Sequence, residues 1–286
     1  MVLRNCYKNW LPLLILYLMG MLPDKIFLRN GLVLSLNSRD TIHGIIANLF
    51  GLAVLLQNGW SIKNANDGSL VMYHSSMQIE IKCRLNNGAD LYHLVEIFVE
   101  KRYSSFFEGK VILDVGMSNA DSAIYFAKNG ALLVIGLEPS PDSFALATEN
   151  VKINNLQKVI IPLNVALASR SGMADFLVSS RETNGDRLDG VSLQSFKYDS
   201  KIDVRTTTID NLVQEFELSR IDLLKMDCEG CEHDALLNLN SGALDRISEI
   251  IAETHGSSNK ISNFLSRNHF QVRMEFDTNL HAKKLA

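Results

Sequence analysis

The sequence predicts an α/β protein whose C-terminal two-thirds form a doubly wound, mostly parallel sheet. Three observations support this fold class. From Gly109 onward, short and fully apolar runs alternate with helical segments, which is typical of consecutive β-α-β units. Acidic residues directly follow several of these runs, where strands of such a sheet would end at a ligand-binding edge. Apolar residues make up 47% of the 286 residues, enough for a large buried core.

The chain is predicted to divide into an N-terminal α/β extension, residues 1–105, and a main domain, residues 106–286. In the extension, apolar residues occupy every second position of 77–85, which indicates a strand with one buried and one wet face, as in antiparallel sheets. A further short strand is expected at 32–36, and helices are expected at 41–57 and 90–103.

An apolar run from Trp10 to Leu22 opens the extension, and Pro12 and Gly20 interrupt it. It is shorter than the roughly 20 apolar residues that span a bilayer. No small-residue cleavage site follows it, as a signal peptide would require. We therefore expect a helix packed on the protein without stable membrane insertion; a secretory or membrane-surface role is the alternative. Four cysteines are too few for a disulfide scaffold, so a cytoplasmic location is expected.

The main domain is predicted to contain five strands of the parallel sheet, with helices between most of them. The strands are expected at 111–113, 132–137, 159–163, 221–226 and 250–252. Residues 271–276 and 279–283 are expected to close the sheet. Residues 172–208 are predicted to be an insertion, with two strand-like pieces around the polar loop 179–200.

The loop after the first of these strands indicates the kind of cofactor. Glu138 ends the second strand, 24 residues after Asp114, close to the spacing of about 20 at which an acid reaches the ribose hydroxyls of a nucleoside. Dinucleotides also need Gly-x-Gly-x-x-Gly for their pyrophosphate, and here only Gly116 is present. An acid at Asp114 suits the positive charge of S-adenosylmethionine and would repel a pyrophosphate. The alternative is a tight turn in which Asp114 only caps a helix.

These considerations predict two groups of site residues. The cofactor-binding residues are expected to be Asp114, Gly116, Ser118, Glu138 and Pro139. The candidates for a catalytic base are Asp227, Glu229, Glu232, Glu253 and His255, all near strand ends. Among them, Asp227 and His255 are predicted to be catalytic, together with Lys225, which orients an acid, binds substrate or forms a simple ion pair.

No metal site is predicted. Cys228 and Cys231 form a C-x-x-C at the start of a helix, a pattern that also occurs in zinc and redox sites. The sequence nearby has no second pair of cysteine or histidine ligands to complete a tetrahedral zinc site. Neighbouring acids also disfavour a thiolate. Zinc or redox chemistry at this pair is therefore the minor alternative.

Five short motifs follow one another in the main domain: Asp114-Val-Gly116, Gly136-Leu-Glu138-Pro139-x-Pro141, Thr208-Ile-Asp210-Asn-Leu212, Ile221-Asp222-Leu-Leu-Lys225-Met-Asp227-Cys-Glu229-Gly230-Cys-Glu232 and Glu253-Thr-His255. Their order and sequence resemble FkbM-type methyltransferases over about residues 109–286. The resemblance implies a Rossmann-like class I methyltransferase fold and methyl transfer to the hydroxyl oxygen of a sugar or secondary metabolite. In that family the loop usually reads Asp-Val-Gly-Ala-Asn-x-Gly, whereas this chain has Ser118 in place of the asparagine and Ala120 in place of the last glycine.

Charge limits the range of substrates. The net charge is −4 with a pI near 6.0, and no basic run is longer than Lys283–Lys284, so a nucleic-acid substrate is not expected. The sequence therefore predicts an S-adenosylmethionine-dependent O-methyltransferase acting on a small-molecule or glycan hydroxyl. The alternatives are a non-catalytic binding domain of the same fold and, with less support, a nicotinamide-dependent oxidoreductase.

Overall fold

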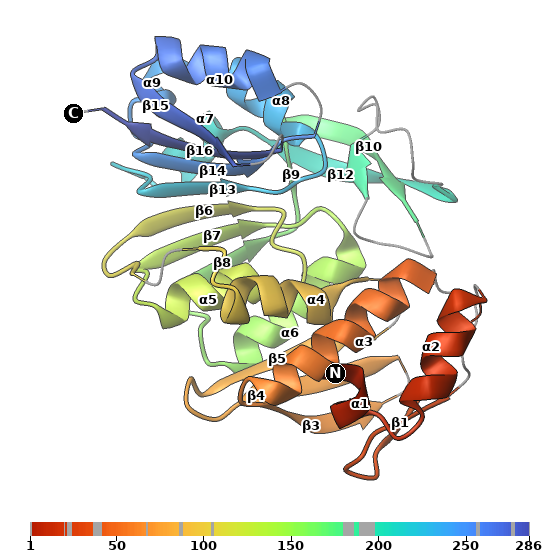
Figure 1. Cartoon of the computed structure of the whole chain (residues 1–286). Helices are drawn as coiled ribbons and strands as arrows, with labels where there is room; N and C mark the ends of the chain where they lie inside the picture. Colours follow the sequence, from red (N-terminus) through yellow and green to blue (C-terminus); the bar gives the residue numbers. More distant parts are fainter. Residues whose placement is uncertain are drawn as a thin grey trace. The chain divides into compact units, whose positions relative to one another are not determined.

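The chain forms two compact units in the computed structural model (Figure 1). One comprises Met1–Ser104 with Ser180–Asn184, and the other comprises Ser105–Ser179 with Gly185–Ala286. The structure describes residues 2–19, 21, 25–36, 42–66, 68–85, 88–103, 106–179, 186–188, 198–255, 258–275 and 278–285.

A seven-stranded sheet forms the centre of the second unit. Its strands are β6 (Val111–Val115), β7 (Leu133–Leu137), β8 (Ile160–Leu163), β13 (Leu223–Met226), β14 (Glu249–Glu253), β15 (Phe270–Glu275) and β16 (Asn279–Lys284). Their order is β15-β16-β14-β13-β6-β7-β8. The first five are mutually parallel, whereas β16 is antiparallel to both of its neighbours. The chain starts at β6, proceeds outward to β8 and then returns to β13, so the strand order reverses between β6 and β13. The predicted fold class is confirmed.

Helices cover the sheet on both faces, as Figure 1 shows for α5 and α6 on one side and α8 and α10 on the other. The helices of this unit are α5 (Asp121–Lys128), α6 (Pro141–Ile153), α7 (Ile209–Glu215), α8 (Cys231–Leu237), α9 (Ser241–Leu244) and α10 (Ser258–Arg267). Pro141 occupies the first turn of α6, where a fixed φ and a missing N–H cost nothing. The core between sheet and helices consists of buried aliphatic side chains, among them Leu113, Ile135, Leu224 and Ile250.

The insertion after β8 forms a small sheet of its own. Its strands are β9 (Ala166–Leu167), β10 (Gly172–Val178), β11 (Arg187–Leu188) and β12 (Ser200–Thr207), in the order β11-β10-β12-β9. The two expected strand-like pieces are β10 and β12. Much of the expected polar loop, residues 180–185 and 189–197, lies outside the described residues.

The first unit contains a three-stranded antiparallel sheet and several helices. The strands β3 (Trp60–Asn66), β4 (Ser69–His74) and β5 (Ile79–Arg84) are consecutive, and a hairpin of β1 (Lys25–Phe27) and β2 (Val33–Ser35) lies apart from them. The helices are α1 (Val2–Cys6), α2 (Trp10–Leu18), α3 (Ile42–Gln57) and α4 (Asp90–Leu94), which continues as a π-helix over Val95–Val99. Asn48 of α3 ties these elements together, because its amide donates to the carbonyls of Leu85 and Gly88.

Two expectations for this unit differ from the structure. The helix expected to reach residue 103 ends at Val99. Met77 lies in the turn before β5 with 38% of its surface exposed, so the buried alternation begins only at Ile79. The strands β3 and β4 were also not expected. In β3, polar residues obscure the period-2 pattern.

The N-terminal apolar run forms α2, but most of that helix is not buried. Its large side chains Leu11, Leu14, Ile15 and Leu18 are exposed, whereas Leu13 is buried. The expectation of a helix packed closely on the protein is therefore wrong for most of its surface. Among the described residues, no helix combines the length and the apolar character needed to cross a membrane.

Candidate functional site

The carboxyl ends of β6, β7, β13 and β14 meet at one edge of the parallel sheet, next to the point where the strand order reverses. In open α/β sheets, ligands bind at this position. Gly116, Glu138, Asp227 and His255 each follow one of these four strands closely. The topology therefore brings together residues from four separate parts of the sequence.

The loop after β6 depends on a glycine. Gly116 has a φ of +75°, and a Cβ at this position would overlap the backbone carbonyl oxygen of Asp227. The amides of Gly116 and Met117 both donate to the carbonyl of Leu137, at 3.0 and 3.1 Å. The backbone of the loop after β6 thus lies directly against the end of β7 and the residue after β13.

Glu138 connects the loops that follow β6 and β7. Its Oε2 accepts a hydrogen bond from the Ser118 amide and its Oε1 accepts one from the Ser140 amide, both at 2.9 Å. Asn164 donates to the main-chain carbonyls of Glu138 and Pro139 and fixes the same turn. Each carboxylate oxygen has further lone-pair capacity, so Glu138 can still accept a bond from a ligand hydroxyl.

Asp114 and Lys225 form an ion pair inside the protein. Lys225 Nζ lies 3.0 Å from Asp114 Oδ1, and their side chains are 5% and 0% exposed. Lys225 also donates to the Gly116 carbonyl at 2.7 Å, and Ser122 donates to Asp114 Oδ2 at 2.6 Å. Both side chains therefore stabilise the loop after β6, and both are buried.

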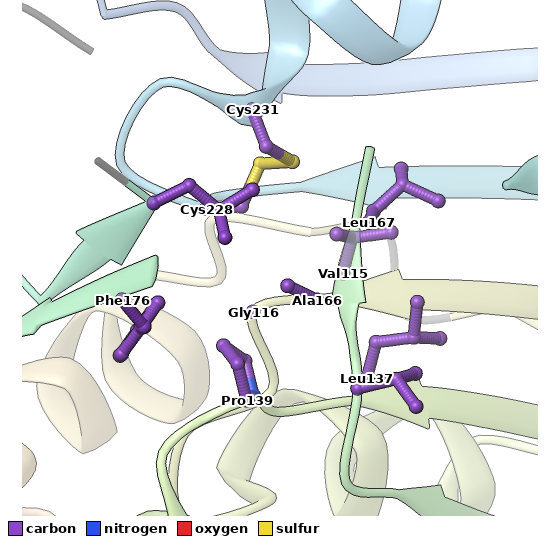
Figure 2. A pocket seen from close by; sticks show the side chains of 11 residues that line it. Val115, Gly116, Leu137, Pro139, Ala166, Leu167, Phe176, Cys228 and Cys231 are labelled. Carbon is purple, nitrogen blue, oxygen red and sulfur yellow. A yellow bond between two sulfur atoms is a disulfide. The ribbon is translucent and has the colours of Figure 1, made fainter. Parts of the chain in front are cut away.

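A small apolar pocket that is partly open to solvent lies beside this loop (Figure 2). Gly116 and Pro139 line it, together with Val115, Leu137, Val165, Ala166, Leu167, Phe176, Leu188, Cys228 and Cys231. The sequence did not predict that residues 165–167, Phe176 and Leu188 line this pocket. Isolated apolar residues in an insertion carry no local signal that they face a ligand rather than the core.

Cys228 and Cys231 are joined by a disulfide that lines the same pocket (Figure 2). From the sequence, zinc or redox chemistry at this pair was the minor alternative, and a disulfide between the two residues was not predicted. The turn at Glu229 and Gly230, which both have positive φ, brings the two Cα atoms to 5.5 Å, within reach of a disulfide.

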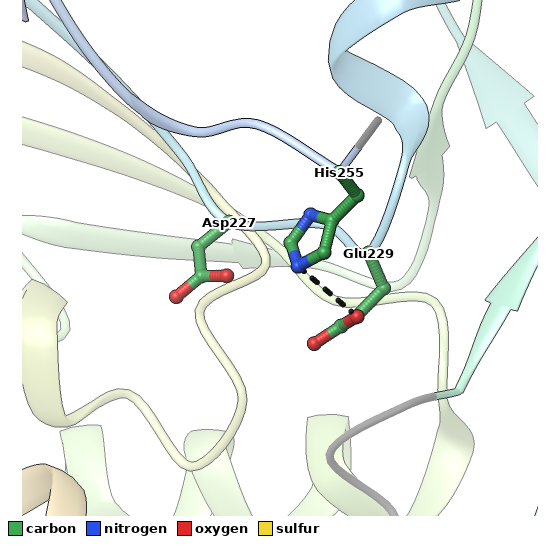
Figure 3. A group of neighbouring side chains, drawn as sticks. All are labelled: Asp227, Glu229 and His255. Carbon is green, nitrogen blue, oxygen red and sulfur yellow. Dashed lines mark ion pairs between the residues drawn. The ribbon is translucent and has the colours of Figure 1, made fainter. Parts of the chain in front are cut away.

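Asp227, Glu229 and His255 converge on one another at the sheet edge (Figure 3). His255 Nε2 lies 3.2 Å from Glu229 Oε2, and His255 Nδ1 lies 3.4 Å from Glu232 Oε1. Glu232 is fully buried, and its Oε1 also accepts the Cys228 amide at 3.1 Å. Of the predicted catalytic residues, Asp227 and His255 are therefore close neighbours, whereas Lys225 belongs to the buried pair.

Burial and mutual repulsion perturb the pKa values in this group. Burial raises the pKa of Glu229 to about 7, and the nearby carboxylates of Asp227, Glu232 and Glu253 add to the effect against an opposing contribution from His255. Burial alone would lower the pKa of His255, but the Glu232 hydrogen bond and the charges of Glu229, Glu232 and Asp227 raise it to about 9. The cluster therefore carries excess negative charge in a partly buried place.

Ala120 stands in a conformation that favours glycine. It is fully buried with a φ of +68° at the start of α5, as its departure from the family loop pattern suggested. A left-handed conformation costs a non-glycine residue about 1–2 kcal/mol. We expect Ala120→Gly to tighten S-adenosylmethionine binding or leave it unchanged, as measured by calorimetry. A clear loss of affinity in a folded variant would show that the loop has adapted to alanine.

Comparison with known proteins places this site in a family. The model of the methyltransferase FkbM domain matches residues 114–280, more than half of the chain. A relative named hexuronic acid methyltransferase AglP, from Haloferax volcanii, is 28% identical over 148 residues, or 52% of this chain and 57% of that protein. The AMB antimetabolite synthetase AmbE of Pseudomonas aeruginosa is 26% identical over 236 residues, which cover 68% of this chain but only 11% of that protein.

The methyltransferase FkbM from Methylobacillus flagellatus superimposes with a TM-score of 0.44 and 16% identity, over 67% of this chain and 49% of that one. The chain spans less than two-thirds of the length of both curated relatives. On the evidence of the family match over residues 114–280, the chain belongs to the FkbM methyltransferase domain family.

Proposed function

We propose that this protein is an S-adenosylmethionine-dependent O-methyltransferase that acts on a hydroxyl group of a sugar or another small metabolite. The observation that supports the cofactor most directly is the position of Glu138. Glu138 directly follows β7, and its carboxylate accepts a hydrogen bond from the Ser118 amide in the loop after β6. An acid at this position can accept hydrogen bonds from the ribose of a nucleoside. The relative named a hexuronic acid methyltransferase supports a glycan acceptor.

The residues at the sheet edge fit this cofactor. Gly116 has no side chain, so the loop after β6 can lie directly against the backbone of Asp227 at the end of β13. Glu138 offers hydrogen-bond acceptors for hydroxyls, and the apolar pocket beside Pro139 suits a flat base. Ser118 and its amide belong to the same turn, and the buried pair of Asp114 and Lys225 keeps the turn in place.

The chain itself would contribute positioning and proton acceptance. When bound, S-adenosylmethionine supplies an electrophilic methyl group on a positively charged sulfur. Asp227 directly follows β13 beside Gly116, and its carboxylate would accept the proton of the acceptor hydroxyl. Both ring nitrogens of His255 already face carboxylates, so we assign His255 to positioning Glu229 rather than to proton abstraction. Holding two reactants together in the correct orientation supplies much of the remaining rate.

Glu138→Ala tests the cofactor assignment. Losing a hydrogen-bond partner of a ligand should cost about 1–3 kcal/mol, or about 5–150-fold in affinity for S-adenosylmethionine. The measurement is calorimetry on the folded variant. Glu215→Ala, the same change at an exposed position of α7, should bind like the parent protein. Unchanged affinity in folded Glu138→Ala would reject the assignment.

The two alternative functions predict different results in the same experiments. A non-catalytic domain would bind S-adenosylmethionine but release no S-adenosylhomocysteine with any hydroxylated acceptor in a screen. A nicotinamide-dependent oxidoreductase would bind the dinucleotide instead. The absence of the dinucleotide glycine pattern around Gly116 counts against the latter.

A further inference from the structure

We propose that Asp227, Glu229 and His255 form a binding site for a divalent cation of the magnesium–manganese class. The three residues come from the end of β13, the loop before α8 and the segment after β14. One ligand atom from each lies within 4.8 Å of the others, and all three residues are partly buried (Figure 3). These three side chains already lie close together, at separations near those between ligands of one metal ion.

The distance between His255 and Glu229 agrees with octahedral coordination. With metal–ligand bonds of about 2.1 Å, adjacent ligands lie about 3 Å apart and opposite ligands about 4.2 Å apart. His255 Nε2 and Glu229 Oε2 are 3.2 Å apart, as expected of adjacent ligands. Asp227 accepts no side-chain or main-chain hydrogen bond within the part of the chain that the structure describes, so its carboxylate is available.

Glu232 provides an independent observation that favours a cation. This carboxylate is completely buried and points at the cluster, with Oε1 3.4 Å from His255 Nδ1. Its second oxygen, Oε2, has no hydrogen-bond partner among the described residues. A carboxylate behind a histidine fixes the ring so that the opposite nitrogen faces a metal, which is the usual arrangement around metal-bound histidines.

The neighbourhood of the three residues is rich in carboxylates. Four carboxylates, those of Asp227, Glu229, Glu232 and Glu253, influence one another here, against a single imidazole. Lys225 is the only basic residue in the segment 225–232, and it forms an ion pair with Asp114. Buried charges are normally paired or coordinated to a metal. A bound cation would interact favourably with the carboxylates of Asp227 and Glu229.

The ligand types restrict the identity of the ion. Two carboxylates and one imidazole suit magnesium or manganese better than a soft ion, and the thiols that would favour zinc are tied up in the disulfide of Cys228 and Cys231. Three protein ligands leave positions for water or for an acceptor hydroxyl. Asp227 could coordinate the ion with one carboxylate oxygen and still face that hydroxyl with the other. Binding of the ion does not depend on the proposed function, although its use in methyl transfer does.

Manganese binding to the full chain tests the proposal. After treatment with a chelator and removal of it, the protein should bind one Mn²⁺ per chain, measured by the loss of the free-ion signal in electron paramagnetic resonance. Magnesium should compete for the site. His255→Gln and Glu229→Gln should each weaken binding more than tenfold, and Glu232→Gln should weaken it about 10–100-fold through the orientation of His255.

A second histidine–glutamate pair provides the control. His281 of β16 and Glu249 of β14 form this pair, with His281 Nε2 2.6 Å from Glu249 Oε1. Among the described residues, no third ligand lies near enough to complete a metal site with them. His281→Gln should therefore leave manganese binding unchanged. Because Glu229 is more accessible than Glu232, Glu229→Gln provides a variant that is expected to keep the fold, which circular dichroism would verify.

Three results would overturn the proposal. The first is no Mn²⁺ binding by the folded parent protein, and the second is that folded Glu229→Gln and His255→Gln bind Mn²⁺ as tightly as the parent protein. The third is loss of Mn²⁺ binding in folded His281→Gln. Calorimetry with S-adenosylmethionine separates this outcome from the proposed function. Cofactor binding without Mn²⁺ binding rejects only the cation site. Mn²⁺ binding without cofactor binding supports the cation site and rejects the proposed function.

Discussion

Replacing Asp227 with asparagine is expected to reduce turnover about 10²–10⁴-fold while the affinity for S-adenosylmethionine changes little. Asparagine preserves the shape of the side chain but removes the carboxylate that would accept the hydroxyl proton. The cofactor loop meets Asp227 through the backbone next to Gly116, and the substitution leaves this contact intact. The loss should therefore appear in the chemical step, measured with an acceptor found by screening hydroxylated substrates.

Asp142→Asn is the matched control, because it makes the same chemical change in the exposed first turn of α6. Its turnover should remain close to that of the parent protein. If Asp227→Asn instead keeps its turnover and binds S-adenosylmethionine more weakly, Asp227 is a cofactor ligand and His255 becomes the leading candidate for the base.

Replacing Lys225 with methionine is expected to lower the free energy of unfolding by about 3–5 kcal/mol. The reason is the environment of Asp114, which is completely buried and would keep its negative charge without the ammonium 3.0 Å away. Methionine retains most of the length and volume of lysine, so lost packing contributes little. Urea unfolding monitored by circular dichroism measures the change, and cofactor affinity should fall as the loop at Gly116 loosens.

Two variants separate the buried charge from other effects. Adding Asp114→Asn to Lys225→Met should recover most of the lost stability, because no uncompensated charge then remains inside. Lys201→Met breaks an ion pair with Asp175 that is about half exposed, and it should cost less than about 1 kcal/mol. A similar small loss in Lys225→Met would mean that the buried pair does not stabilise the loop.

The sequence alone was sufficient to predict the sheet and the edge that carries the site. Fully apolar runs identify strands buried on both faces, and the acids after them must gather at one edge because parallel strands end together. Gly116, Glu138, Asp227 and His255 were predicted in this way. The same local patterns failed for β3, whose exposed positions are mostly polar and carry too little apolar signal.

Other features depend on contacts between residues far apart in the sequence. Whether Asp114 faces a cofactor or the interior was decided by Lys225, 111 residues later, which meets it across neighbouring strands. The pocket wall at Phe176 and Leu188 comes from the insertion, and its role follows only from where that small sheet packs. In the same way, the exposure of α2 could not be read from its apolar composition.

The amino-acid sequence therefore allowed us to predict the fold class, the polar residues that follow each strand, and the family of this protein. Local hydrophobic periodicity and motif order encode these properties directly. Only the tertiary structure decided which of those groups meet: that Glu138 binds two loop amides, that Cys228 and Cys231 join, and that Glu229 and His255 close on Asp227. Such contacts are set by side-chain directions and distances of a few ångströms across strands, which spacing along the chain does not specify.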